Sequence, residues 1–347
     1  MLKLIEDYFL ELRGFYMNNI SKYWQKIFLG LGIFAATTAA YSGSEASAPA
    51  HYDTAMIDLL GEIHDYARKQ NPDFQSLANG GSSLFLAIDG NTTENVSKMA
   101  KAVDGQLVES VYYGFNMKDG SKTPKNETEI FQETLDSAKS NGLPVFVLDY
   151  VKDAKQAADV EQKSIAKGYV PLSTPYRGLD KIPSYPISRA NENAVTTLAE
   201  AKNYMIILNP DKFSSTEDYL SSLQNTNYDM LIVDLYAGGR PLSRAEVKKL
   251  QYKPNGARRL VLAYMSVGEA ETYRYYWQSD WKDNPPSWMD EPNEDWQDNY
   301  RVKYWRAEWK HLLYGSPNSY LDKILTAGFD GAFLDVVDVY QYYQEKE

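Results

Sequence analysis

The sequence alternates short apolar runs of strand length with amphipathic stretches of helical length, and this alternation limits the folds open to the chain. Strands that alternate with helices in this way are joined by crossovers and pair in parallel. We predict eight strands, at 74–78, 107–113, 144–150, 169–172, 204–208, 230–235, 260–266 and 331–336. A further apolar run, 84–88, is left outside this count. Eight parallel strands close a (β/α)8 barrel, so we predict an α/β fold made of a single TIM barrel.

Helices are expected between the strands, where apolar side chains recur at intervals of three and four residues. The expected helices span 56–69, 93–103, 128–140, 154–167, 216–223, 244–250, 307–313 and 319–327. The segments 173–186 and 276–300 are rich in Pro and in Ser or Asp, and are predicted to be loops. A chain of 347 residues could also hold two domains. We assign residues 49–347 to one domain, because barrels of roughly 250 residues commonly stand as one unit.

Residues 1–48 have the features of an export signal. Two lysines precede an apolar run at 27–40, and small residues end the segment at 46–48. The run is too short to span a membrane comfortably, which is typical of a secretory signal peptide. The acidic stretch before Met17 makes Met17 a candidate start. The alternative is an uncleaved membrane anchor or a buried helix. We predict that the signal is cleaved and that the protein has no stable membrane insertion afterwards. We therefore expect a secreted or periplasmic protein.

Charge and residue usage exclude several kinds of site. The net charge of −11 argues against a nucleic-acid partner, since phosphate binding requires clustered Lys and Arg. An acidic surface favours neutral or cationic partners, although it commonly serves only solubility. The chain has no cysteine, which excludes disulfides, thiolate metal sites and a cysteine nucleophile. With three histidines, two of them in expected helices, we expect no metal site and no cofactor.

Acidic residues lie within or just after the C-terminal parts of five predicted strands. They are Glu109, Asp149, Asp234, Glu269 and Asp335. The C-terminal ends of parallel barrel strands open on one face, so these side chains are expected to converge there. A buried carboxylate without a partner is costly, so such a set requires polar neighbours or a function that uses it. Each one alone could be a loop cap, an ion pair or a solvent-facing side chain; we interpret the set as a polar active site.

Paired carboxylates indicate glycoside hydrolysis, because one must protonate the leaving oxygen while the other attacks or activates water. Several aromatic side chains lie close to the acidic motifs, where flat rings could stack on sugars. They are Tyr236, Tyr264, Tyr273, Tyr275, Tyr276 and Trp277. The alternative is that these rings pack beneath the long loop, since aromatic residues dominate protein cores.

Three segments carry a family resemblance: LIVDLY at 231–236, VLAYMSVGEAETYRYYW at 261–277 and GFDGAFLDVVDVYQYY at 328–343. They resemble a glycoside hydrolase family formerly described as related to cysteinyl-tRNA synthetase. That family is similar to the endo-α-1,4-polygalactosaminidases of glycoside hydrolase family 114. The resemblance extends over most of the chain from about residue 52 to residue 343.

The order of the segments departs from the family pattern. In the family, the piece resembling NYMIILN comes first, and the pieces resembling VDGQLVESVYYG and PVFVLDYV follow the one resembling GFDGAFLDVVD. In this chain those later pieces come first. The chain is therefore interpreted as a circularly permuted barrel, which remains compatible with the fold where chain ends lie close together.

The resemblance implies roles for individual residues. It implies Asp335 as the nucleophile and Glu109 as the acid/base of an endo-acting, retaining hydrolase. The residues expected to bind substrate are Asp234, Glu269, Asp338, Asp149, Tyr264, Tyr236 and Asn79. The implied substrate is an amino-sugar polysaccharide like α-1,4-galactosaminan, whose positive charge would suit an acidic protein. The alternative is a non-catalytic carbohydrate-binding barrel.

Overall fold

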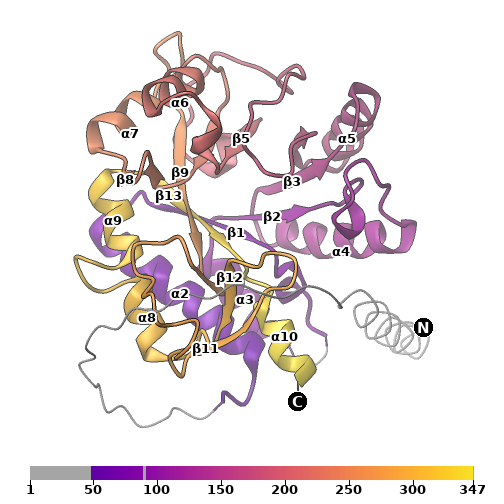
Figure 1. The fold of residues 1–347 in the computed structure, drawn as a ribbon. Helices are drawn as coiled ribbons and strands as arrows, with labels where there is room; N and C mark the ends of the chain where they lie inside the picture. The colour runs from indigo at the N-terminus through magenta and orange to yellow at the C-terminus, as the bar shows by residue number, and fades with distance from the viewer. Residues whose placement is uncertain (1–47, 89–90, 347) are drawn as a thin grey trace.

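The computed structural model describes residues 48–88 and 91–346, so all but the last residue of the expected export signal lies outside the described part. Eight parallel strands form a nearly closed barrel surrounded by helices (Figure 1), which confirms the predicted TIM-like α/β fold. In hydrogen-bonded order the strands are β4 (Val170–Thr174), β3 (Val145–Tyr150), β2 (Gly105–Glu109), β1 (Gln75–Asn79), β13 (Gly331–Asp335), β9 (Leu260–Ser266), β6 (Met230–Val233) and β5 (Tyr204–Ile207). Each overlaps a predicted strand, although β2 begins two residues earlier and ends four residues earlier than the predicted strand at 107–113. The apolar run left outside the count begins in a short 3-10 helix, η1 (Ser82–Phe85).

Helices connect most of the strands and pack on the outside of the barrel. They are α2 (Tyr52–Gln70), α3 (Thr93–Ala102), α4 (Lys125–Ser140), α5 (Ala154–Lys167), α6 (Thr216–Gln224), α7 (Arg244–Leu250), α8 (Ala307–Leu313), α9 (Tyr320–Ala327) and α10 (Val339–Lys346). Their ends follow local chemistry: α5 begins at Asp153, whose side chain accepts from the backbone of Gln156, and ends at Gly168 in the left-handed conformation. The sequence predicted these helices except α10.

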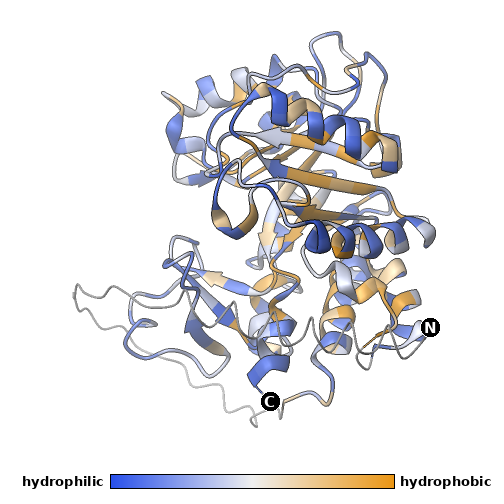
Figure 2. Cartoon of the chain, turned by 90° about the vertical axis from the view of Figure 1, so that its right-hand side faces the viewer, coloured by the Kyte–Doolittle hydropathy of each residue, from blue (hydrophilic) through white to orange (hydrophobic). Residues whose placement is uncertain are grey.

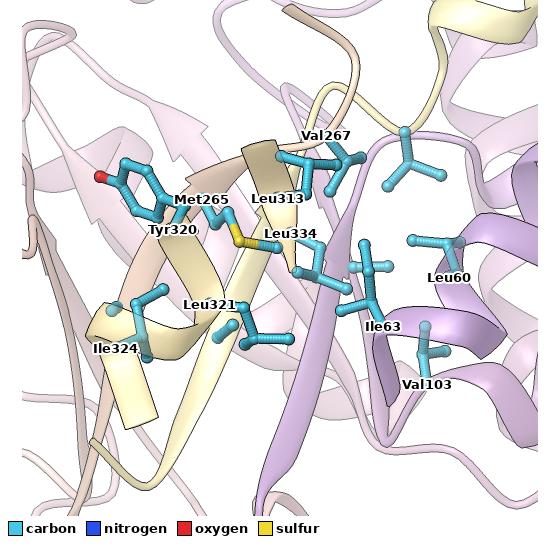
Figure 3. Packing of buried hydrophobic residues seen from close by; sticks show 14 of the residues in the cluster. Leu60, Ile63, Val103, Met265, Val267, Leu313, Tyr320, Leu321, Ile324 and Leu334 are labelled. Carbon is cyan, nitrogen blue, oxygen red and sulfur yellow. The ribbon is translucent and has the colours of Figure 1, made fainter. Parts of the chain in front are cut away.

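The strands are buried on both faces, so side chains alternate between two cores. Phe333 of β13 packs inside the barrel, whereas Leu334 packs outward among the helices. Figure 2 shows the apolar strands lying between helices whose polar residues face outward. Figure 3 shows the outer core at close range, with Leu334 lying between Ile63 of α2 and Leu321 of α9. The apolar residues of the inner core stop short of the C-terminal ends of the strands, and this leaves room there for a site.

The segment predicted as a loop at 276–300 contains strands. After β9 the chain forms β10 (Glu269–Glu271), β11 (Met289–Pro292) and β12 (Asn299–Val302), which pair as a small antiparallel sheet. The register of β11 shifts between Met289 and Pro292, and these residues pair with Val302 and Tyr300, so local periodicity does not reveal the strand. Buried Trp288 contacts both Trp281 and Trp309, with ring centres 5.1 Å apart in each pair. Packing therefore accounts for part of the aromatic content of this region.

The connection from β4 to β5 differs from the others. It spans residues 175–203 and contains only a one-turn 3-10 helix, η3 (Leu198–Glu200). β4 and β5 are also the two ends of the hydrogen-bonded strand order, so the barrel has its seam there. By contrast, β1 pairs directly with β13, which brings the first and last strands of the barrel together. Among the described residues, no helix has the length and apolar character needed to cross a membrane.

Candidate active site

A cleft of about 1280 Å³ opens at the C-terminal ends of the strands. Seven of the nine residues predicted from the sequence line it: Asn79, Glu109, Asp234, Tyr264, Glu269, Asp335 and Asp338. Four of the five strand-end carboxylates thus face one cleft, and Asp149 does not. Asn79, Glu109 and Asp335 end β1, β2 and β13, and Asp234 directly follows β6. This is the face on which TIM barrels place their chemistry.

Strand geometry explains which side chains reach the cleft. Residues two apart on a strand point to the same face. Phe333 lies in the inner core, so Asp335, two residues later, also points inward. Leu107 likewise lies in the inner core, so Glu109 points inward as well. On β3 the inward residues are Phe146, Leu148 and Tyr150, and Asp149 therefore points outward.

Asn79 joins the two predicted catalytic carboxylates. Its Nδ2 donates to Glu109 Oε1 at 2.9 Å and to Asp335 Oδ1 at 2.7 Å. β1, which carries Asn79, lies between β2 and β13 in the sheet, so the three side chains come from adjacent strands. Asn79 is buried at 6% exposure. One buried amide nitrogen thus holds both carboxylates at the base of the cleft.

Burial and mutual repulsion favour a proton on the carboxylate pair. Removal from water, followed by the negative charge of Glu109, raises the pKa of Asp335 to about 7, although the hydrogen bond from Asn79 opposes the shift. Two close carboxylates cannot both ionise easily, so the negative charge of Glu109 disfavours ionisation of Asp335. Near neutral pH Asp335 is therefore present in both its protonated and its ionised forms.

The backbone is strained immediately after each member of this pair. Ser110, which follows Glu109, has φ 57°, and Val336, which follows Asp335, has φ 62°. A β-branched residue at positive φ is uncommon, and such strain of about 1–3 kcal/mol gathers at functional sites. The Val336 conformation lets its N–H donate to Asp335 Oδ1 at 2.9 Å. It also requires Gly268 beside it, where an added Cβ would lie 2.3 Å from the Val336 carbonyl oxygen.

Arg274 neutralises a second acidic group in the cleft, and the sequence analysis did not identify it. Its Nη1 donates to Asp234 Oδ2 at 2.7 Å and to Oδ1 at 3.0 Å, while its Nε pairs with Glu271. Burial raises the pKa of Asp234, and the charge of Arg274 opposes this rise. Asp234 therefore lines the cleft as one member of a buried ion-pair network.

Two of the predicted substrate-binding residues lie away from the cleft lining. Asp149 is fully buried, and its Oδ1 accepts from the backbone N–H groups of Tyr112 and Tyr113 at 2.6 and 2.7 Å. Tyr236 is half-buried and stacks on Tyr275 with ring centres 5.8 Å apart. In the structure, Asp149 organises the backbone after β2, and Tyr236 packs among other aromatic rings.

Part of the chain is similar to known proteins. The sequence model of glycoside-hydrolase family GH114 matches residues 184–347. An uncharacterised protein of Methanocaldococcus jannaschii is 39% identical over 129 residues, which are 36% of this chain and 35% of that protein. One of Thermotoga maritima is 30% identical over 142 residues (39% and 42%), and one of Deinococcus radiodurans is 32% identical over 128 residues (37% and 39%).

The chain thus spans about two fifths or less of the length of these relatives. The family match covers β5 to α10, with Asp234, Glu269 and Asp335, whereas Asn79 and Glu109 lie before it. The segment that resembles GH114 therefore carries Asp335, one carboxylate of the pair.

Proposed function

We propose that this protein is an exported glycoside hydrolase that cleaves an amino-sugar polysaccharide resembling α-1,4-galactosaminan, with Asp335 and Glu109 as its carboxylate pair. The observation that carries the proposal is the placement of both carboxylates on one Asn79 amide nitrogen at the base of the cleft. Hydrolysis of a glycosidic bond requires two such groups on either side of the anomeric carbon. The family match over residues 184–347 supports the same activity.

The short spacing of the pair favours retention of anomeric configuration. Because one nitrogen contacts both carboxylates at 2.7 and 2.9 Å, the separation of the two bonded oxygens cannot exceed the sum of these distances. That limit lies below the roughly 6.5–9.5 Å of inverting enzymes and close to the roughly 5–5.5 Å of retaining ones. A retaining mechanism needs no room for a water molecule between the carboxyl groups in its first step.

In the proposed cycle Asp335 attacks the anomeric carbon and Glu109 gives its proton to the departing glycosidic oxygen. The new bond joins an Asp335 oxygen to the sugar, and the old C–O bond breaks with its electron pair on the leaving group. Glu109, now ionised, then takes a proton from water, whose oxygen displaces Asp335 from the sugar. Asn79 bonds to both groups and so stabilises whichever carries the charge.

Charge in the cleft supports a cationic amino-sugar substrate. Acidic side chains outnumber basic ones along the lining, and the two arginines present, Arg177 and Arg274, are already paired with carboxylates. The whole chain carries a net charge of −11. A negative cleft concentrates a positively charged polymer near its surface. We propose internal cleavage of the chain, because the cleft is open rather than a closed pit for one sugar.

The decisive experiment compares wild type with Asp335→Asn and Glu109→Gln on purified α-1,4-galactosaminan. Wild type is expected to release reducing ends, with mixed oligosaccharide lengths from internal cleavage, and both variants to lose at least about a thousandfold in rate. Glu133→Gln, an exposed change on α4, is the control and should match wild type. Binding of the polymer by wild type without release of reducing ends would contradict the proposal and indicate a carbohydrate-binding barrel instead.

The roles within the pair are tested by azide rescue. Azide is expected to restore turnover of an activated glycoside by Asp335→Gly and to give a glycosyl azide of inverted configuration, because azide replaces the missing nucleophile. Glu109→Gly should give the retained azide, since the nucleophile is intact and azide acts in the second step. The opposite pair of products would show that the two carboxylates exchange these roles.

We also propose that the chain is a circular permutant of the family barrel. The order of the sequence motifs suggests it, and the connection at the β4–β5 seam, which contains no α-helix, is where the family's ends would lie. The family match begins at residue 184, inside that connection. An engineered chain that starts at residue 184, with residues 346 and 48 joined by a flexible linker, is expected to fold and keep activity. A chain cut instead at Gly168, between α5 and β4, should be less stable; equal stability would contradict the proposal.

A further inference from the structure

Trp296 is the exposed aromatic side chain that most needs an explanation. Its side chain is 49% exposed and lines the same cleft as the carboxylate pair. Within the ranges that the structure describes, the other tryptophans are buried or packed against the core. A solvent-exposed indole at the edge of a cleft can bind the apolar face of a ligand.

The turn that carries Trp296 is held by its own hydrogen bonds. Asn293 Oδ1 accepts from the N–H of Asp295 at 3.0 Å and of Trp296 at 3.4 Å. The N–H of Asn299 donates to the Trp296 carbonyl at 2.8 Å, and the N–H of Asn293 donates to the Asn299 carbonyl at 2.7 Å. The turn is therefore closed at its base, between β11 and β12.

Glu269 accepts hydrogen bonds from residues on both sides of the base of this turn. Its Oε1 accepts from Asn293 Nδ2 at 2.6 Å, and its Oε2 accepts from Asn299 Nδ2 at 3.0 Å. Glu269 is 2% exposed, and burial raises its pKa, while the two amide donors act in the opposite direction. Both oxygens are engaged by the turn that presents Trp296. This arrangement gives a buried carboxylate of the cleft a positioning role.

We propose that Trp296 forms a distal sugar-binding subsite at the cleft rim, on which a pyranose ring stacks, and that Glu269 is the positioning residue that holds it. The inference rests on the proposed function and extends it to a specific subsite. The apolar face of a pyranose matches the flat indole, and the exposed carboxylates of Asp295 and Asp298 line the same rim. Those carboxylates suit a sugar that carries an amine.

The test measures binding rather than turnover, in an Asp335→Asn background that cannot hydrolyse the ligand. α-1,4-Galactosamine tri- and octasaccharides are titrated calorimetrically into this protein, with and without Trp296→Ala. We expect Trp296→Ala to weaken octasaccharide binding about 3- to 10-fold, the range that one aromatic contact supplies, and to leave trisaccharide binding unchanged. Trp296→Phe keeps a ring and should retain most of the affinity. Equal octasaccharide affinity in the Trp296→Ala protein, or no binding of either ligand, would overturn the subsite.

The role of Glu269 is tested by a double-mutant cycle in the same background. Glu269→Gln leaves one oxygen and introduces a second donor facing the Asn293 and Asn299 amides, so the turn should lose its fixed position. We expect Glu269→Gln to weaken octasaccharide binding, and to add nothing further when Trp296 is already Ala. Additive losses would show that Glu269 touches the sugar directly and would overturn its positioning role.

This design separates the subsite from the hydrolase proposal. If wild type releases no reducing ends but octasaccharide binding depends on Trp296, the subsite stands and the hydrolase proposal falls. If wild type hydrolyses the polymer and Trp296→Ala binds the octasaccharide as tightly as its parent, the subsite falls alone.

Discussion

The hydroxyl of Tyr150 donates a hydrogen bond to Glu109 Oε2 at 2.6 Å. Glu109 pairs with Leu148 in the sheet, so Tyr150 lies two residues further along the neighbouring strand and on the same inward face. The guanidinium of Arg177 lies 3.8 Å from the centre of the Tyr150 ring and also pairs with Asp119. With Asn79 on its other oxygen, Glu109 is oriented from two strands and does not depend on solvent for its position.

Tyr150→Phe should therefore damage catalysis more than folding. The change removes one hydrogen bond to a charged group, worth about 1.5–3 kcal/mol, and keeps the ring that packs in the inner core. We expect kcat/KM on galactosaminan to fall roughly 10- to 100-fold, with a free energy of unfolding lowered by no more than about 3 kcal/mol. Steady-state kinetics and urea denaturation measure the two quantities. A large loss of stability with normal activity in the folded fraction would contradict this role.

The pH dependence of activity follows from the pKa of Asp335, which burial and the negative charge of Glu109 raise to about 7. Asp335 therefore loses its proton as the pH rises through that value. Since the proposed nucleophile attacks in its ionised form, kcat/KM should rise as the pH increases to about 7. A rate that is already at its maximum at pH 5 would contradict the raised pKa of Asp335.

The same coupling can be measured directly by carbon-13 NMR of the carboxyl groups. Glu109→Gln removes the negative charge that helps to raise the pKa of Asp335, so this pKa should move down toward its ordinary value. The Asn79→Ala change should move it up, because the lost hydrogen bond favoured the ionised form. Identical titration of Asp335 in all three proteins would show that the groups do not interact.

Loss of Arg274 should destabilise the protein strongly. Arg274→Met would leave the Asp234 and Glu271 carboxylates buried without their cation, which typically costs about 3–5 kcal/mol. Arg240→Met breaks an exposed ion pair with Glu246 and is the matched control, with an expected change within about 1 kcal/mol. Urea denaturation measures both free energies of unfolding. Similar effects of the two changes would mean that the buried network contributes no more than a surface pair.

Asp149 gives a pH-dependent stability that is separate from catalysis. Burial raises its pKa to about 7, against an unfolded value of about 3.9. The folded protein therefore binds this proton more tightly, and the stabilisation is full below about pH 4 and is lost as the pH rises to about 7. Relative to Asp149→Asn, wild type should lose about 1.4 kcal/mol of unfolding free energy per pH unit in this window. A difference independent of pH would contradict the raised pKa.

The barrel could be predicted from the sequence because its signals are local. Strand-length apolar runs and helical periodicity depend on neighbours within a few residues, and all eight strands were located in this way. The strand-end position of Glu109 and Asp335 follows from the same runs, since parallel strands share one C-terminal face. The strands of the small sheet were missed because β11 and β12 are stabilised by pairing and by buried tryptophans rather than by their own pattern.

Tertiary structure alone determined which strand-end groups act together. In a strand buried on both faces, apolar residues occupy inward and outward positions alike, so the sequence VFVLDY does not reveal that Tyr150 faces the cleft and Asp149 does not. The partners of Asp234 and Glu269 lie 24 to 40 residues away and meet them only after the chain folds. The amino-acid sequence thus determined the barrel and the acidic residues at its C-terminal end, whereas the shared Asn79 contact and the repulsion between Glu109 and Asp335 arise from three strands brought side by side.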